Sequence, residues 1–218
     1  MGSLRLAVAR DEAFCFYYNE NLRELERAGF EITGFSPLHD RELPGDTAGL
    51  YIGGGYPELH AKTLSKNEGV LVDIKHKADS GMPILAECGG FMYLTEAITD
   101  ENGKSRKMCG IFDVKCVKTD RLVRFGYVGI FDNTGHWLEP GKGVKGHEFH
   151  YYDTVKEGAI CTNGSGAKII KASNGTEYTG IYITDTIWAG WPHLYFRSES
   201  AFVEKFYDKC RTYKEHIK

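Results

Sequence analysis

Strand-like and helix-like segments alternate along the first hundred residues, and this alternation restricts the possible fold more than any other feature of the chain. Short apolar runs typical of buried strands lie at residues 4–9, 31–37, 47–54 and 82–88. Apolar residues recur at helical spacing in segments 15–30, 65–79 and 90–98, with Ser65 placed to cap the second. Because parallel strands need long crossover connections, the pattern predicts an α/β protein with a parallel sheet and helices on both faces.

The second half of the chain has a different pattern. Residues 104–190 alternate short strand-like pieces with turns rich in Gly, Asn and Asp. This predicts antiparallel strands that pack on or continue the first sheet. Residues 198–218 have the pattern of a closing helix capped by Ser198 or Ser200. No repeat, low-complexity segment or linker interrupts the chain, so we expect a single domain over residues 1–218.

Composition argues against several classes of function. The formal net charge is −3, which favours neither a nucleic-acid partner nor an anionic membrane surface. No apolar run reaches the roughly 18 residues that a membrane span needs. The six cysteines form no CxxC pair, and the first residues show no signal-peptide core. We therefore expect free thiols in a cytoplasmic protein.

The segment "PILAECGGFMYL" at residues 83–94 places a cysteine between a predicted strand and a predicted helix. Ligands of open α/β sheets bind at the carboxyl ends of the strands, and a nucleophile on a sharp turn there projects toward them. Gly89 and Gly90 allow such a turn. We expect the free N–H groups of the helix start to favour the Cys88 thiolate and to bind an oxyanion. The structural alternative is that Cys88 is a small buried hydrophobic residue.

A second glycine-rich segment, "GLYIGGGYPELH" at residues 49–60, ends the neighbouring predicted strand. We expect it on the same rim as Cys88, with backbone N–H groups aimed at a substrate carbonyl oxygen. Phosphate binding is the alternative, but the P-loop pattern and the dinucleotide fingerprint are both absent. Glu87 should point to the opposite face of its strand from Cys88, which predicts a structural role or a buried hydrogen-bond acceptor instead of a general base.

A thiol nucleophile needs a base, usually histidine, and the chain has eight histidines. "GHEFHYY" at residues 146–152 places two of them three residues apart, whereas the zinc-protease motif H-E-x-x-H places them four apart. A metal site is therefore the minor hypothesis for this segment. Spacing leaves both His150 and His193 as candidate bases. Arg10, Asp11 and Glu12 follow the first strand and are expected to face the cleft or a partner interface.

Six segments together resemble the class I glutamine amidotransferase domain in its corrin-amidating branch, the cobyrinic acid a,c-diamide synthase family. They are "LAVARDEAFCFYY" (6–18), "FSPLHDRELP" (35–44), "YIGGGYPELHAKTLSKN" (51–67), "PILAECGGFMYL" (83–94), "RFGYV" (124–128) and "GHEFHYY" (146–152). The resemblance runs nearly end to end. It implies a three-layer α/β/α, flavodoxin-like fold with a mixed sheet, parallel in the first half of the chain and with antiparallel additions in the second.

The resemblance also implies roles for individual residues. Cys88 matches the glutaminase nucleophile, and His193 matches the catalytic histidine, which chooses between the two candidate bases. The oxyanion hole would use the backbone amide of Gly89 and one amide from Gly54 or Gly55. Glutamine would lie beside Tyr56, Pro57, Glu58, Phe149 and His150. Many class I enzymes have a glutamate two residues after the histidine, where this chain has Tyr195; its absence implies a cysteine–histidine dyad and agrees with the corrin branch.

The implied activity is glutamine hydrolysis through a cysteine thioester. The ammonia would serve ATP-dependent amidation of the a and c carboxylates of cobyrinic acid, a ligase step of cobalamin biosynthesis. Because the chain contains no P-loop, we expect ATP and Mg²⁺ only in a partner synthetase domain or subunit that also binds the corrinoid, and no cofactor in this chain. The alternatives are a glutaminase serving nickel-sirohydrochlorin or a cell-wall precursor, a non-catalytic scaffold, and a cysteine hydrolase or chaperone without a glutamine pocket.

Overall fold

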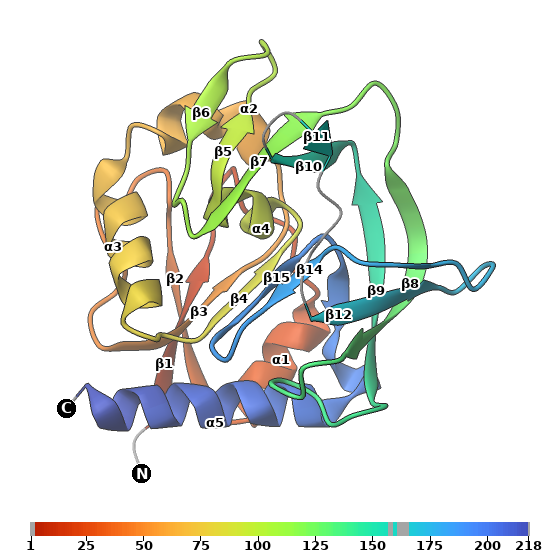
Figure 1. Cartoon of the computed structure of the whole chain (residues 1–218). Coiled ribbons are helices and arrows are strands. Elements are labelled where there is room, and N and C mark those ends of the chain that lie inside the picture. The colour runs from red at the N-terminus through yellow and green to blue at the C-terminus, as the bar shows by residue number, and fades with distance from the viewer. Residues whose placement is uncertain (1–2, 157–158, 161–165, 218) are drawn as a thin grey trace.

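The computed structural model describes residues 3–156, 159–160 and 166–217, and a central sheet organises this part of the chain (Figure 1). Its strand order is β14-β15-β4-β3-β1-β2. The parallel strands are β1 (Leu4–Ala9), β2 (Phe30–Phe35), β3 (Thr47–Ile52), β4 (Ile84–Glu87) and β15 (Ile187–Gly190). The edge strand β14 (Ile181–Ile183) pairs antiparallel with β15. The predicted parallel sheet is therefore confirmed, and the second half of the chain contributes one of its parallel strands.

The second half also forms most of two further sheets among the described residues. The first has the order β11-β10-β7-β5-β6 and consists of β5 (Thr95–Thr99), β6 (Ser105–Lys107), β7 (Phe112–Lys118), β10 (Tyr152–Lys156) and β11 (Ala159–Ile160). The other has the order β13-β12-β8-β9-β16 and consists of β8 (Arg124–Asp132), β9 (Gly143–His150), β12 (Ala167–Lys171), β13 (Glu177–Tyr178) and β16 (His193–Tyr195). Most of the antiparallel strands thus lie beside the central sheet instead of extending it.

Both faces of the central sheet are covered because its strands are apolar on both sides. In β1, Ala7 and Ala9 belong to one hydrophobic cluster, and Leu6 and Val8 to the other. Helices α2 (Pro57–Leu64), α3 (Glu68–Asp79) and α4 (Gly89–Leu94) contribute to the first cluster. Helices α1 (Asn19–Arg27) and α5 (Ser200–His216) contribute to the second, together with β8, β9 and β12. Figure 1 shows α5 running across one end of the molecule, away from β5, β6 and β7.

Four local predictions about helix bounds and caps are wrong. The segment at 65–79 does not begin a helix at Ser65, because Ser65 is the C-cap of α2 and α3 begins at Glu68. The predicted helix at 90–98 ends at Leu94, and the residues from Thr95 onward pair with β6 and β7 as strand β5. Long-range strand pairing overrides the local helical spacing there.

The helix predicted over 15–30 is shorter than its pattern suggested, and the closing helix lacks the expected cap. Helix α1 begins at Asn19, so the aromatic residues before it lie in the loop that follows β1. Neither serine makes a side-chain cap at α5, where Glu199 occupies the N-cap position. The Ser198 hydroxyl instead donates to the Tyr195 carbonyl and accepts from the Lys145 N–H. No helix in the described residues is long and apolar enough to cross a membrane.

Candidate active site

Cys88 lies at the turn between β4 and α4, as the sequence predicted. Its φ of 48° and ψ of −105° place a non-glycine residue at positive φ, a conformation that needs support from its surroundings. The Cys88 N–H donates to the Gly190 carbonyl at 2.7 Å, and its carbonyl accepts from the Met92 N–H at 3.0 Å. A Cβ at Gly90 would lie 2.1 Å from the Ile52 carbonyl oxygen, so the turn can approach β3 only with glycine at this position.

The glycine loop after β3 lies directly against this turn. Gly55 has a φ of 156°, and a Cβ there would lie 2.1 Å from the Ala13 carbonyl oxygen. Its nitrogen is 3.1 Å from the place that a Cβ on Gly89 would take. The Gly54 N–H donates to the Phe16 carbonyl at 3.2 Å, so it is already engaged. Within the described residues the Gly55 N–H has no hydrogen-bond partner, which leaves Gly55 and not Gly54 with an amide open to a ligand.

His193 begins β16 and lies on the other side of the glycine loop. It pairs with His147 of β9, and a Cβ at Gly54 would lie 2.3 Å from its Cε1. The Phe16 ring packs against the imidazole with centroids 4.7 Å apart. The glycine loop therefore contacts both the Cys88 turn, through Gly55, and the imidazole, through Gly54.

Two pockets adjoin these residues. Cys88 lines a pocket of about 730 Å³ together with Gly55, Tyr56, Glu58, Phe149 and His150. His193 lines a different pocket of about 510 Å³ together with Tyr18, Tyr127, His147 and Tyr195. The predicted nucleophile and base thus share the glycine loop but open onto different pockets in this structure.

The electrostatics of the pair favour neutral groups. Burial, and then the charge of Glu58, raise the pKa of the Cys88 thiol to about 12. Burial, followed by the charges of His147 and His150, lowers the pKa of His193 to about 4. The resting site near pH 7 therefore holds a thiol and a neutral imidazole. The Gly89 N–H at the helix start lowers the pKa of Cys88, as predicted, but burial outweighs it and the thiol stays protonated in this state.

Within the described parts of the chain, no ring hydrogen bond orients the His193 imidazole. Its Nδ1 is buried and has no partner among the described residues. The main chain beside it is held instead: the Leu194 N–H donates to Glu87 Oε1 at 3.0 Å, and the Leu194 carbonyl accepts from Asn21 Nδ2 at 2.7 Å. The prediction that Glu87 is a buried acceptor on the far face of β4 is confirmed. Asn21 was missed by the sequence reasoning because its partner is 173 residues away.

Residues predicted to surround the substrate mostly line the Cys88 pocket. Tyr56, Glu58, Phe149 and His150 do so, whereas Pro57 begins α2 and its Cδ lies 2.9 Å from the Cβ position of Gly89. The pocket has further charged residues that the sequence did not single out, namely Glu101, Lys118 and Asp120. Burial raises the pKa of Glu58.

His150 presents one free nitrogen. Its Nδ1 lies 2.7 Å from the Tyr152 carbonyl oxygen, which can only accept, so Nδ1 carries the proton. The ring stacks on Trp191 with centroids 4.2 Å apart. Nε2 is buried and has no partner in the described part of the chain. Burial lowers the pKa of His150 to about 4, so at neutral pH this nitrogen is a hydrogen-bond acceptor next to the pocket.

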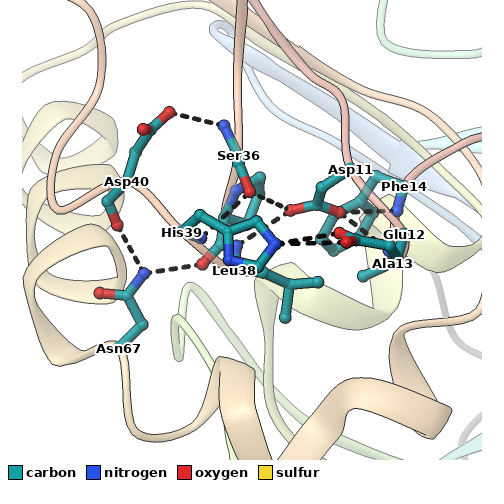
Figure 2. Close-up of polar contacts among 10 residues, drawn as sticks. Asp11, Glu12, Ala13, Phe14, Ser36, Leu38, His39, Asp40 and Asn67 are labelled. Carbon is teal, nitrogen blue, oxygen red and sulfur yellow. Dashed lines mark hydrogen bonds and ion pairs between the residues drawn. The ribbon is translucent and has the colours of Figure 1, made fainter.

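The Asp11 carboxylate joins the loop that follows β1 to the loop that follows β2 (Figure 2). One oxygen accepts from the N–H groups of Ala13 and Phe14 at 2.9 and 3.1 Å, and the other accepts from Ser36 Oγ and the Leu38 N–H. The Ala13 carbonyl in turn accepts from the Tyr56 N–H at 2.9 Å. Asp11 therefore supports the glycine loop through Ala13 and does not line the Cys88 pocket.

Comparison with known proteins assigns the family. Residues 5–201 match the CobB/CobQ-like glutamine amidotransferase domain, and the chain belongs to this family. It is 50% identical over 151 residues to the cobyrinate a,c-diamide synthase of Caldanaerobacter subterraneus subsp. tengcongensis, covering 68% of this chain and 33% of that protein. It is 37% identical over 213 residues to the cobyrinate a,c-diamide synthase of Priestia megaterium, covering 97% of this chain and 45% of that protein. The chain thus spans less than half the length of these relatives.

Solved structures with low sequence identity share the fold. PurLQS from Thermotoga maritima superposes with a TM-score of 0.63 at 17% identity, covering 99% of this chain and 100% of that chain. A glutamine amidotransferase from Thermotoga maritima gives a TM-score of 0.56 at 11% identity, covering 100% of this chain and 87% of that chain. The predicted α/β class I glutamine amidotransferase fold is confirmed.

Proposed function

We propose that this chain is the glutaminase part of an enzyme that amidates cobyrinic acid. The observation that carries the proposal is the strained Cys88 turn, which lines a pocket large enough for an amino acid beside the open Gly55 amide. Family membership and the names of the relatives support glutamine as the nitrogen donor and cobyrinate as the acceptor. A glutaminase serving nickel-sirohydrochlorin or a cell-wall precursor, and a scaffold that does not hydrolyse glutamine, are the alternatives.

The reaction begins from the neutral pair. The Cys88 thiol transfers its proton to His193, and the sulfur attacks the side-chain carbonyl carbon of glutamine to form a C–S bond. The carbonyl electron pair moves to the oxygen, which accepts hydrogen bonds from the N–H groups of Gly55 and Gly89. His193 then protonates the amide nitrogen, the C–N bond breaks, and ammonia and a thioester remain.

Water completes the cycle. His193 removes a proton from a water molecule, the oxygen attacks the thioester carbon, and the C–S bond breaks to release glutamate and the thiol. His193 returns the proton taken from water to the departing sulfur, and both this transfer and the first one, from the thiol, require the imidazole to reach the sulfur. Cys88 and His193 line different pockets in this structure. We therefore propose that the two side chains come into contact when glutamine or the partner binds. The chain alone is accordingly expected to hydrolyse glutamine weakly.

The charges of the Cys88 pocket fit a zwitterionic amino acid. Glu58 supplies a carboxylate for the α-ammonium group, and the free Nε2 of His150 supplies a second acceptor. Lys118 supplies a cation for the α-carboxylate. Phe149 and Tyr56 would cover the aliphatic part of glutamine. This arrangement favours free glutamine over a peptide-bound glutamine residue.

An exposed aromatic face supports the proposed synthetase partner, which would hold ATP, Mg²⁺ and the corrinoid. Phe125 and Phe149 face each other across β8 and β9 and are 58% and 50% exposed. Tyr127 pairs with His147 and is 74% exposed, and His147 pairs with His193. The face thus continues to the proposed base. Because the relatives are more than twice as long as this chain, a further domain is available in them to cover it.

The test measures glutamate release from glutamine by the chain alone and with the separately expressed N-terminal part of a cobyrinate a,c-diamide synthase. We expect slow release alone and faster release with the synthetase part, cobyrinic acid and MgATP. Cys88→Ser should abolish release and covalent trapping of a glutamine-like electrophile. Release that persists in Cys88→Ser, or no release by the wild-type chain under any of these conditions, would contradict the proposal.

A further inference from the structure

We propose that Glu87 is a positioning residue for His193, holding the main chain beside the imidazole in place of an acid that contacts the ring. The inference rests on the proposed role of His193 as the base of glutamine hydrolysis. The chain has Tyr195 where many class I enzymes have a glutamate that would orient this histidine. In the described residues the buried Nδ1 of His193 also has no hydrogen-bond partner.

Glu87 is almost completely buried, with 2% of its surface exposed, and both of its oxygens are used. Oε1 accepts from the Leu194 N–H at 3.0 Å, and Oε2 accepts from the Tyr51 hydroxyl at 2.8 Å. Tyr51 is fully buried in β3, so the carboxylate is itself fixed by a rigid strand. Glu87 therefore connects the centre of the sheet to the residue that follows His193.

The opposite side of the same peptide segment is held as well. Asn21 is fully buried, donates to the Leu194 carbonyl at 2.7 Å and accepts from the Phe196 N–H at 3.0 Å. Leu194 is thus anchored at its N–H by Glu87 and at its carbonyl by Asn21. The imidazole packs against Gly54 and the Phe16 ring, and its buried Nδ1 has no hydrogen-bond partner in the part of the chain that the structure describes. Because β16 has only three residues, removal of one anchor should let its backbone move.

Glu87 cannot act as the base itself. It lies on the face of β4 that packs against Tyr51, whereas Cys88 lines the substrate pocket. In the described residues no hydrogen bond joins its carboxylate to the imidazole, because both oxygens already have other donors. Its effect on the reaction must therefore pass through the position of His193.

The kinetic test compares three substitutions in the glutaminase assay with the synthetase part present. Glu87→Ala should lower kcat about 100-fold with KM for glutamine changed less than about twofold, since small misplacements of a catalytic group have effects of this size. Glu87→Gln keeps an acceptor for the Leu194 N–H and should restore kcat to within about fivefold of wild type. Asp132→Ala is the matched control, because Asp132 is equally buried and accepts main-chain N–H groups of Trp137 and Leu138 away from both pockets.

A second measurement does not depend on activity. Histidine ¹⁵N chemical shifts of the chain alone are followed against pH, with the His193 signal assigned by its loss in His193→Gln. The titratable groups that act on the imidazole are His147 and His150, and its pocket also contains Tyr18, Glu20, Tyr127, Lys145 and Tyr195. We expect the titration midpoint of His193 to be low in wild type and in Asp132→Ala, and to rise toward the ordinary histidine value in Glu87→Ala as the ring gains solvent.

An unchanged His193 titration and kcat in Glu87→Ala would overturn the inference, as would an equal loss of kcat in Asp132→Ala. Failure of Glu87→Gln to restore kcat would also overturn it, because the acceptor role predicts rescue. If Glu87→Ala does not fold, Tyr51→Phe removes the donor to Oε2 and should lower kcat about threefold to tenfold with the same shift in titration; no change there would overturn the inference. A wild-type chain without glutaminase activity would refute the proposed function. The His193 titration could still be measured and would still test whether Glu87 positions the ring.

Discussion

The turn around Cys88 and the short strand that carries His193 are built by contacts of very different range. The turn has its two glycines next to the cysteine, and the Cys88 carbonyl accepts from a residue four positions on. The His193 strand depends on Glu87 and Asn21, which lie 107 and 173 residues away from Leu194. The comparison teaches that the glycines that allow the Cys88 turn lie next to it in the sequence, although Gly190 also holds its N–H, whereas the strand of the proposed base is anchored by distant residues alone.

The glycine loop joins these two regions, so changing it should have the largest effect. Gly55→Ala should lower kcat about 10²–10³-fold, because the new Cβ would collide with the Ala13 carbonyl and displace the open amide. Gly34→Ala is the control, since a Cβ there meets nothing within 4 Å. Steady-state glutamate release measures both. Full activity of Gly55→Ala would mean that the loop does not connect the two regions.

The free energy of unfolding should depend on pH through Glu87, which anchors the strand that carries His193. Burial raises the pKa of Glu87 to about 7, so its contribution to stability is fully present below about pH 4.5 and is lost as the pH rises through 7. Glu87→Gln lacks this dependence, so between pH 5 and 8 the wild type should lose about 2–3 kcal/mol relative to the variant. Urea unfolding at the two pH values measures the difference. If the unfolding free energies of wild type and Glu87→Gln differ by the same amount at both pH values, the Glu87 carboxylate is not buried as described.

The decrease of kcat/KM at low pH distinguishes a buried histidine base from an exposed one. Because the pKa of His193 is lowered to about 4, the neutral imidazole persists well below the ordinary histidine range. We expect kcat/KM to fall only as the pH approaches 4, and to be roughly tenfold higher at pH 5.5 than a base with an unperturbed pKa would allow. A decrease of kcat/KM centred near pH 6.5 would show that His193 is solvated or is not the base.

The smallest expected effect concerns the nucleophile alone. The Glu58 charge is the second cause of the raised pKa of Cys88, after burial. Glu58→Gln should therefore increase the rate of Cys88 alkylation by iodoacetamide at pH 8 about threefold, because more thiolate is present. Glu101→Gln is the control, since Glu101 lines the same pocket but is not among the causes of the shift. Equal rates in both variants would contradict the electrostatic assignment.

Local pattern predicted the parts of this fold that depend on neighbours in sequence. The strands β1, β3 and β4, the Cys88 turn and the side of β4 taken by Glu87 all follow from apolar runs, glycines and strand alternation. The prediction was wrong at Thr95–Thr99, where helical spacing gave way to pairing with β6 and β7. It also did not separate Gly54 from Gly55, because the carbonyl that accepts from the Gly54 N–H belongs to Phe16 in another loop.

The sequence by itself determined that a thiol stands on a glycine-flanked strand end, beside a second glycine-rich strand end. These features are encoded within a few residues, where backbone sterics act directly. Only the tertiary structure decided that the imidazole lies across the glycine loop, that Glu87 and Asn21 anchor its strand, and that both reactive groups are neutral at rest. Those properties depend on burial and on partners more than a hundred residues away, which exist only once the sheet has formed.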